Sequence, residues 1–159
     1  MKLIIGIIIV LIGVFIVLKK RNIKKTKSYK WNLENENLKT DFTNVLSKNP
    51  NLKYLIVEFD SYYIQYKGFM KSKEFYSEIV SNDFLDEENQ YSENQKNRIF
   101  SLGFLEPQKK DSDGNISPNY SKWYGAKSVK EIDMIFNELI KILESIYQLK
   151  KGTEIKIRW

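Results

Sequence analysis

The spacing of apolar residues changes along the chain, and each change marks an element. Residues 3–18 are apolar without interruption. In residues 32–50 apolar side chains recur every three or four positions, which predicts a helix with one apolar stripe. The stripe consists of Leu38, Phe42, Val45 and Leu46. The helix ends before Pro50, because the residue that precedes a proline avoids helical backbone angles.

Three runs rich in β-branched and aromatic residues follow, at 53–60, 62–70 and Glu74–Val80. The polar break at Asp60-Ser61 predicts a β-hairpin between the first two runs. Because all three runs are close in sequence, we expect them to pair as an antiparallel meander.

The C-terminal half continues with helix and strand signals. Ser92, with Gln95 three positions later, forms a capping-box pattern that starts a short helix, and Gly103 ends it. Residues 107–118 read as a polar loop, and the aromatic cluster that follows them predicts a fourth strand. The cluster consists of Tyr120, Trp123 and Tyr124.

A second capping-box pattern, from Ser128 to Glu131, starts the longest predicted helix. Its apolar positions recur every three or four residues as far as Ile146, which indicates extensive packing. Gly152 follows, and Thr153–Trp159 alternates as a last strand. Together these elements predict an α+β domain over residues 31–159, in which helices flank an antiparallel sheet.

The apolar run at the N-terminus predicts a single transmembrane helix. Its sixteen residues span about 24 Å as a helix, and flanking lysines can reach the surfaces of a bilayer core that is about 30 Å thick. A cleaved signal peptide has its basic residues before the apolar run, whereas here they follow it. We therefore expect an anchor at residues 1–18, a basic juxtamembrane linker at 19–30, an external N-terminus and a cytoplasmic domain.

The net charge of +6 belongs to this N-terminal region and not to the domain. Eight of the 26 basic residues and none of the 20 acidic residues lie in residues 1–30, so the remainder carries 18 − 20 = −2. This distribution argues against a nucleic-acid partner. It predicts contact with membrane lipid through the basic side chains nearest the anchor. They are Lys19, Lys20, Arg21, Lys24 and Lys25.

The chain has no cysteine and no histidine, which removes most nucleophilic, general-base and zinc chemistry. Asp111–Asn115 resembles the start of a calcium loop, but Ile116 and Lys122 stand where an EF-hand needs Gly and Glu, so a turn fits better. Asp83–Glu88 reads as an exposed acidic loop before a helix rather than a pair of catalytic carboxylates. We predict no catalytic residue, metal or cofactor.

The tyrosines of the second strand are the candidate protein-binding residues. Tyr62 and Tyr66 alternate with Tyr63, so they point to opposite faces of the strand. Helices bury one face, and the tyrosines on the other face are then available to a partner, since tyrosine combines a large ring with a polar tip. The candidate residues are Tyr62, Tyr63 and Tyr66, and which of them are exposed stays open.

Several short motifs follow the early hairpin: EIVSNDFL at Glu78–Leu85, NRIFSLGFLEP at Asn97–Pro107, and PNY at Pro118–Tyr120 before the long helix. In this order the chain from Leu55 to about Gln148 resembles the TY-chaperone domain, a bacterial module with a type III secretion chaperone-like fold. Phe104 stands where that family usually has Trp. The resemblance implies a helix–sheet–helix sandwich that binds other polypeptides, often as a homodimer.

These observations predict a membrane-tethered, non-enzymatic module that binds a polypeptide or acts as a chaperone. The alternative is an immunity protein that neutralises a toxin, which would also be small, non-catalytic and acidic on its surface. An enzyme that uses only Asp, Glu, Ser, Tyr or Lys is a third hypothesis, and no sequence feature favours it.

Overall fold

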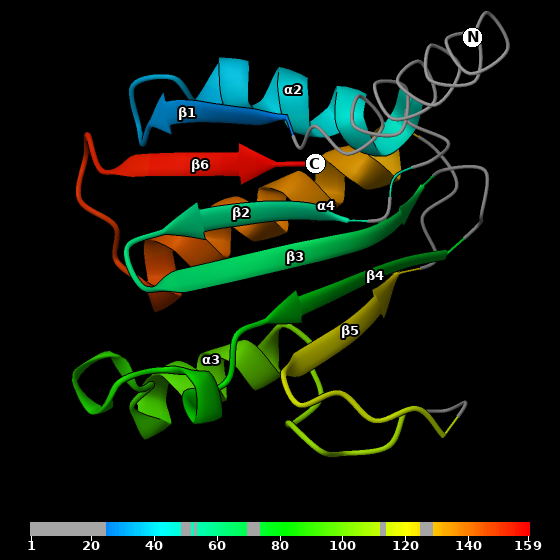
Figure 1. The fold of residues 1–159 in the computed structure, drawn as a ribbon, viewed down its shortest axis with the longest axis vertical. Helices are drawn as coiled ribbons and strands as arrows, with labels where there is room; N and C mark the ends of the chain where they lie inside the picture. The colour runs from blue at the N-terminus through cyan, green and yellow to red at the C-terminus, as the bar shows by residue number, and fades with distance from the viewer. Residues whose placement is uncertain (1–24, 49–51, 53, 70–73, 112–113, 125–128) are drawn as a thin grey trace, which may run out of the picture.

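The computed structural model describes residues 25–48, 52, 54–69, 74–111, 114–124 and 129–159. They form a six-stranded antiparallel sheet with the strand order β1-β6-β2-β3-β4-β5 (Figure 1). The strands are β1 (Thr26–Lys30), β2 (Leu55–Phe59), β3 (Tyr62–Phe69), β4 (Glu74–Ile79), β5 (Tyr120–Tyr124) and β6 (Glu154–Arg158). The helices are α2 (Asn35–Lys48), α3 (Glu93–Ser101) and α4 (Val129–Lys141), and a π-helical turn, η4 (Ile142–Ile146), continues α4.

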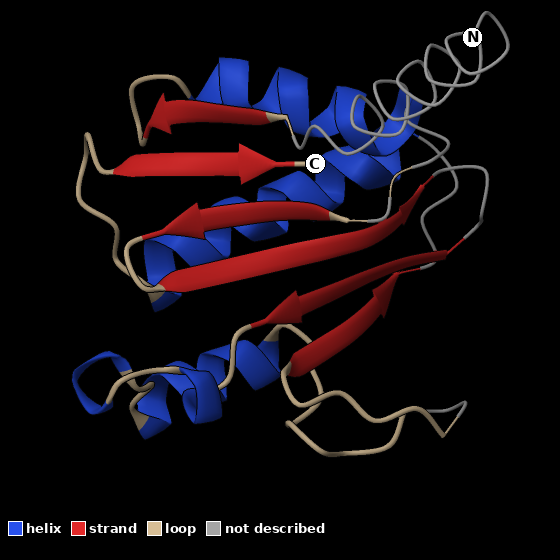
Figure 2. Cartoon of the chain, in the orientation of Figure 1, coloured by secondary structure: helices blue, strands red, loops and turns tan. Residues whose placement is uncertain are grey.

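Among the described helices, α2 and α4 cover one face of the sheet, and none covers the other. Both lie behind the strands in the view of Figure 2. Strand alternation sorts the side chains between the two faces. On β2, Leu55, Val57 and Phe59 are buried beneath the helices, whereas Ile56 and Glu58 between them are half-buried. We call the second surface the front face.

The predicted amphipathic helices supply the other half of the core. All four stripe residues of α2 are buried, as predicted. Phe42 of α2 packs between Tyr66 of β3 and Phe136 of α4, with ring centroids 5.0 Å and 5.4 Å apart. The α+β class, the antiparallel sheet and the meander β2-β3-β4 are confirmed.

The folded domain begins earlier than its predicted boundary at residue 31. Thr26–Lys30, assigned to the basic linker, forms the edge strand β1 and pairs with β6 over five residues. Lys25 continues the pairing, because its backbone exchanges two hydrogen bonds with Trp159, at 2.9 and 3.0 Å. Tyr29 is buried on the helix-covered face. The prediction failed because residues 24–30 show no alternating apolar pattern. They contain four lysines and a single apolar residue, Tyr29.

The C-terminal half follows the prediction closely. Ser92 and Gln95 form both hydrogen bonds of the capping box at the start of α3. The aromatic segment Tyr120–Tyr124 is the edge strand β5. The last strand is present as well, and it lies inside the sheet between β1 and β2. The second capping box falls on Ser128, outside the described residues.

The membrane predictions fall mostly outside the described residues. The predicted span at residues 3–18 and four of the five predicted lipid-contacting side chains, all except Lys25, belong to the part of the chain that is not described. Within the described ranges, no helix has the length and apolar character to cross a bilayer.

Candidate functional site: a tyrosine-lined cleft

A cleft of about 520 Å³ opens at the end of the sheet where β2 turns into β3. We call this end of the sheet the cleft end. The lining residues come from the β2–β3 turn and from the start of β6, and they are Glu58, Phe59, Asp60, Ser61, Tyr62, Tyr63, Glu154 and Lys156. Two of the three tyrosines predicted as protein-binding residues therefore line one cavity.

The floor of the cleft is a row of side chains that crosses three strands on the front face. Tyr63 of β3 is paired with Glu58 of β2, which in turn is paired with Lys156 of β6. Glu58 also forms an ion pair with Arg158, so its charge is compensated within the sheet. The Tyr63 hydroxyl accepts a hydrogen bond from the Asn119 amide at 3.2 Å. The Tyr63 side chain as a whole is half-exposed.

Tyr62 connects the cleft to the acidic loop that follows β4. Its hydroxyl donates a hydrogen bond of 2.9 Å to the carbonyl oxygen of Asn89. Its ring packs against Phe59, Tyr91 and Tyr147, with centroids 4.7–5.8 Å apart. Burial, reinforced by the negative charge of Asp60, raises the pKa of Tyr62. Tyr62 is therefore a neutral hydrogen-bond donor whose contacts fix the loop beside the cleft.

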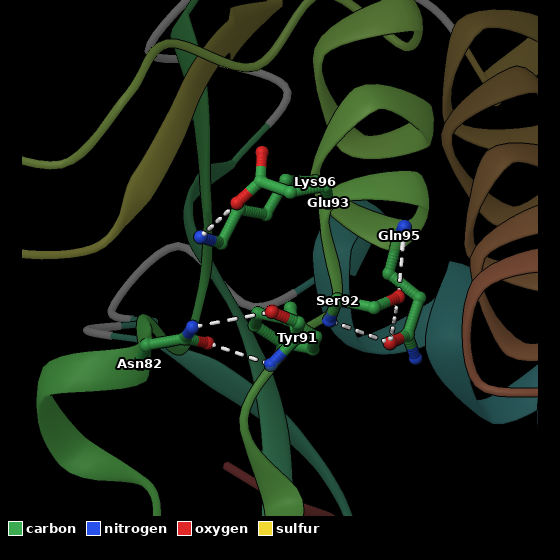
Figure 3. Close-up of polar contacts among 6 residues, drawn as sticks. All are labelled: Asn82, Tyr91, Ser92, Glu93, Gln95 and Lys96. Carbon is green, nitrogen blue, oxygen red and sulfur yellow. Dashed lines mark hydrogen bonds and ion pairs between the residues drawn. The ribbon is translucent and has the colours of Figure 1, made fainter.

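Figure 3 shows how the beginning and the end of this loop are joined. The Asn82 side chain accepts a hydrogen bond from the backbone nitrogen of Tyr91 at 2.8 Å and donates one to its carbonyl oxygen at 3.3 Å. Next to it, Ser92 caps α3. Tyr91 is thereby placed so that its hydroxyl lies 2.7 Å from that of Tyr147. Asn82, which belongs to the EIVSNDFL motif, thus has a structural role here, which is to close the acidic loop.

Tyr66, the third predicted residue, does not belong to a binding surface. It is 1% exposed and lies under α2 and α4 in the core. The prediction for Tyr66 is wrong, because the helices cover the face of β3 that carries it. Tyr63 points to the opposite face, and only its side of the strand is open to a partner.

Negative charge dominates the connections at the cleft end of the sheet. The four connections at this end of the sheet, residues 31–34, 60–61, 80–92 and 147–153, contain six carboxylates and two lysines. The carboxylates are Glu34, Asp60, Asp83, Asp86, Glu87 and Glu88. In the cleft itself, a hydrogen bond from Ser28 and the neighbouring Lys156 lower the pKa of Glu154. Lys156 also forms an exposed ion pair with Glu154 at 3.9 Å, so a cationic partner would compete with Lys156 for this carboxylate. The site presents carboxylates beside aromatic rings, a combination that suits cationic side chains.

A second cavity, of about 560 Å³, lies between α4 and β5. Three of its polar side chains bind one another: Lys122 pairs with Glu138, and Glu138 also accepts a hydrogen bond from Tyr124. The ammonium group of Lys122 additionally lies 4.8 Å from the centre of the Tyr124 ring. This network fixes β5 to α4, and the pairing of its charges favours a structural role.

The acidic residues that the structure describes do not assemble into a metal site. Among the described residues, no group of three or more carboxylates is arranged to hold an ion. Asp111 and Asn115 instead form the predicted turn, in which the Asn115 backbone nitrogen donates to the Asp111 carboxylate at 2.9 Å.

Comparisons with protein-family models, with curated proteins and with solved structures found no match. The resemblance to the TY-chaperone domain therefore stays a prediction that rests on the sequence motifs.

Proposed function

We propose that this chain is a membrane-tethered, non-enzymatic module that binds a polypeptide partner through the cleft at the β2–β3 turn. The observation that carries the proposal is the combination of a half-exposed tyrosine, Tyr63, with carboxylates on a face that α2 and α4 do not cover. Rigid aromatic anchors are typical of interface centres, and charged rims select the partner.

The charge of the site indicates the chemistry of the partner. Because Asp60 and Glu154 line the cleft and the acidic loop lies at the same end of the sheet, we infer a partner segment that presents Lys or Arg next to apolar side chains. The aliphatic stem of such a residue packs on Tyr63, and its charged end meets the carboxylates. An acidic site of this kind disfavours nucleic acid, whose phosphates would be repelled.

The membrane tether is the second part of the proposal. It is supported by the unbroken apolar run at residues 3–18 and by the basic residues that follow it. The immunity hypothesis uses the same cleft and differs only in its partner, a toxin with a basic surface. A toxin gene beside this gene would favour that alternative.

A direct test measures peptide binding to the full chain in nanodiscs of neutral phosphatidylcholine, so that the lipid attracts no charge. The probes are two synthetic peptides of equal length, one with Lys and Leu and one with Glu and Leu. We expect the lysine peptide alone to bind. Asp60→Asn combined with Glu154→Gln should weaken binding about tenfold.

The matched control, Glu106→Gln combined with Glu144→Gln, removes two exposed carboxylates outside the cleft and should leave affinity unchanged. Tyr63→Ala should weaken binding, whereas Ile116→Ala, at an exposed apolar residue elsewhere, should not. Equal binding of both peptides, or equal loss in the cleft and control variants, would overturn the proposed site.

A further inference from the structure

The tether that the proposed function assumes is short, and it enters the folded domain at one particular end. Six residues, 19–24, separate the predicted span from Lys25, which is already paired with Trp159. Six extended residues reach at most about 20 Å. The end of the sheet where β1 begins and β6 ends is therefore held close to the bilayer surface. We call it the tether end, on the right in Figure 1.

Exposed lysines from four different elements gather at the tether end. Lys25 precedes β1, Lys48 is the last residue of α2, Lys67 lies near the end of β3, and Lys130 is in the first turn of α4. Antiparallel connections bring these positions to the same end, because α2 runs back from the end of β1 and α4 starts after β5. Two carboxylates also lie at this end: Glu131 is in the first turn of α4, and Asp111 accepts a hydrogen bond from Trp123 near the end of β5.

The cleft end has the opposite charge: its connections contain six carboxylates and two lysines, and the adjoining strand ends add Lys30 and Glu154. The domain therefore has a charge asymmetry that runs along the strands, parallel to the direction set by the tether. A negatively charged bilayer attracts one end and repels the other. The attraction acts over about a Debye length, roughly 8 to 10 Å, which a tether of this length permits.

We propose that the tether end docks against anionic lipid headgroups and holds the tyrosine-lined cleft on the side of the domain that faces away from the bilayer. Lys25, Lys48, Lys67 and Lys130 contact the headgroups. Trp159, half-exposed beside Lys25, lies at the depth where tryptophan is favoured in membrane interfaces. Docking in this orientation leaves the cleft accessible to a soluble partner. The inference rests on the proposed membrane tether, but not on the identity of the partner.

The absence of cysteine in the chain allows a clean measurement. Ser61→Cys, in the β2–β3 turn at the cleft end, carries a fluorescent donor on the full chain, and the vesicles contain an acceptor on their headgroups. We expect less energy transfer in vesicles that contain phosphatidylglycerol than in pure phosphatidylcholine, because docking holds the cleft end away. High salt should remove the difference.

Charge reversal identifies the surface. The triple variant Lys48→Glu, Lys67→Glu, Lys130→Glu should lower the ratio of docked to undocked chains more than 100-fold, since each lysine lost is worth roughly fivefold. It should then behave in anionic vesicles as the unmodified chain does in neutral ones. The matched control Lys30→Glu, Lys150→Glu, Lys151→Glu makes the same charge change at the cleft end and should still dock.

Each remaining outcome has a distinct meaning. If energy transfer is the same in anionic and neutral vesicles while the chain resists alkaline extraction, docking is overturned and the tether stands. Release of the chain by alkaline extraction overturns the tether itself. Binding of polyglutamate to the lysines in neutral vesicles, without any effect of anionic lipid, would assign the tether end to an acidic protein and overturn the lipid assignment.

Discussion

Tyr63 and Tyr66 belong to the same strand, yet they lie in different environments. Tyr66 is in the core beneath α2 and α4, whereas Tyr63 is half-exposed on the front face and lines the cleft. The chemistry of the two side chains is identical, so the difference comes entirely from strand alternation and from which face the helices cover. An aromatic-rich strand therefore serves both stability and recognition, and the two roles are separable by mutation.

The largest expected effect is on the helix-covered face. Tyr66→Ala should lower the free energy of unfolding by about 4 kcal/mol, because it removes a buried ring and leaves a cavity against Phe42. Tyr63→Ala should cost less than about 1 kcal/mol, as is usual for surface changes. Urea denaturation of both variants measures the contrast. Similar losses in the free energy of unfolding would show that the front face belongs to the core as much as the helix-covered face does.

Removal of β1 extends the comparison to the edge of the sheet. A fragment that starts at Trp31 should be less stable than one that starts at Lys25 by about 3 kcal/mol, since it lacks the buried Tyr29 and exposes one edge of β6. Thermal unfolding of the two fragments checks this. If they melt at the same temperature, β1 contributes nothing, and the linker extends to residue 30 after all.

The polar network on the helix-covered face predicts an intermediate effect. Glu138→Gln removes the charge that Lys122 and Tyr124 share, and it should cost about 2 kcal/mol because a half-buried ammonium group loses its partner. Chemical denaturation gives the value. Glu144→Gln, an exposed change shortly after α4, is the control and should have no measurable effect. Equal values for the two variants would contradict the role of the network.

The smallest effect concerns the ion pair that joins β1 to α2. Hydrogen bonds from Lys27 and Tyr29 lower the pKa of Asp41 below its usual 3.8. A carboxylate with a depressed pKa stabilises the fold above pH 3.8 and loses this contribution as the pH falls through its folded value. Asp41→Asn should therefore cost less than about 1 kcal/mol at neutral pH.

The same comparison at acidic pH tests the cause. The difference in the free energy of unfolding between Asp41→Asn and the unmodified domain should disappear as the pH falls below 3.8. Asp133→Asn, at an ion pair with a longer separation of 3.6 Å, serves for comparison. A gap for Asp41→Asn that stays constant with pH would mean that the side chain acts through packing and not through its charge.

The sequence predicted the elements whose residues alternate or recur clearly, such as the stripe of α2, the hairpin at Asp60-Ser61 and the capping box at Ser92. It missed β1, because backbone pairing with β6 places that strand and a run of lysines conceals it. It left open which face of β3 is covered, since the choice depends on where α2 and α4 pack. The carboxylates of the cleft come from β2, the turn and β6, which are distant in sequence, so no local pattern identifies the site.

The position of β6 affects the order in which the protein can be built. This strand follows the other five in the chain, yet it lies between β1 and β2, so β1 cannot join the rest of the sheet before residues 154–158 have been synthesised. The ribosome adds about 5–20 residues per second. Until residues 154–158 have been synthesised, β1 and the outer backbone edge of β2 have no partner strand. Completion of the sheet therefore waits for the last of its six strands, and the partly formed sheet is most exposed to aggregation and proteases until β6 joins it.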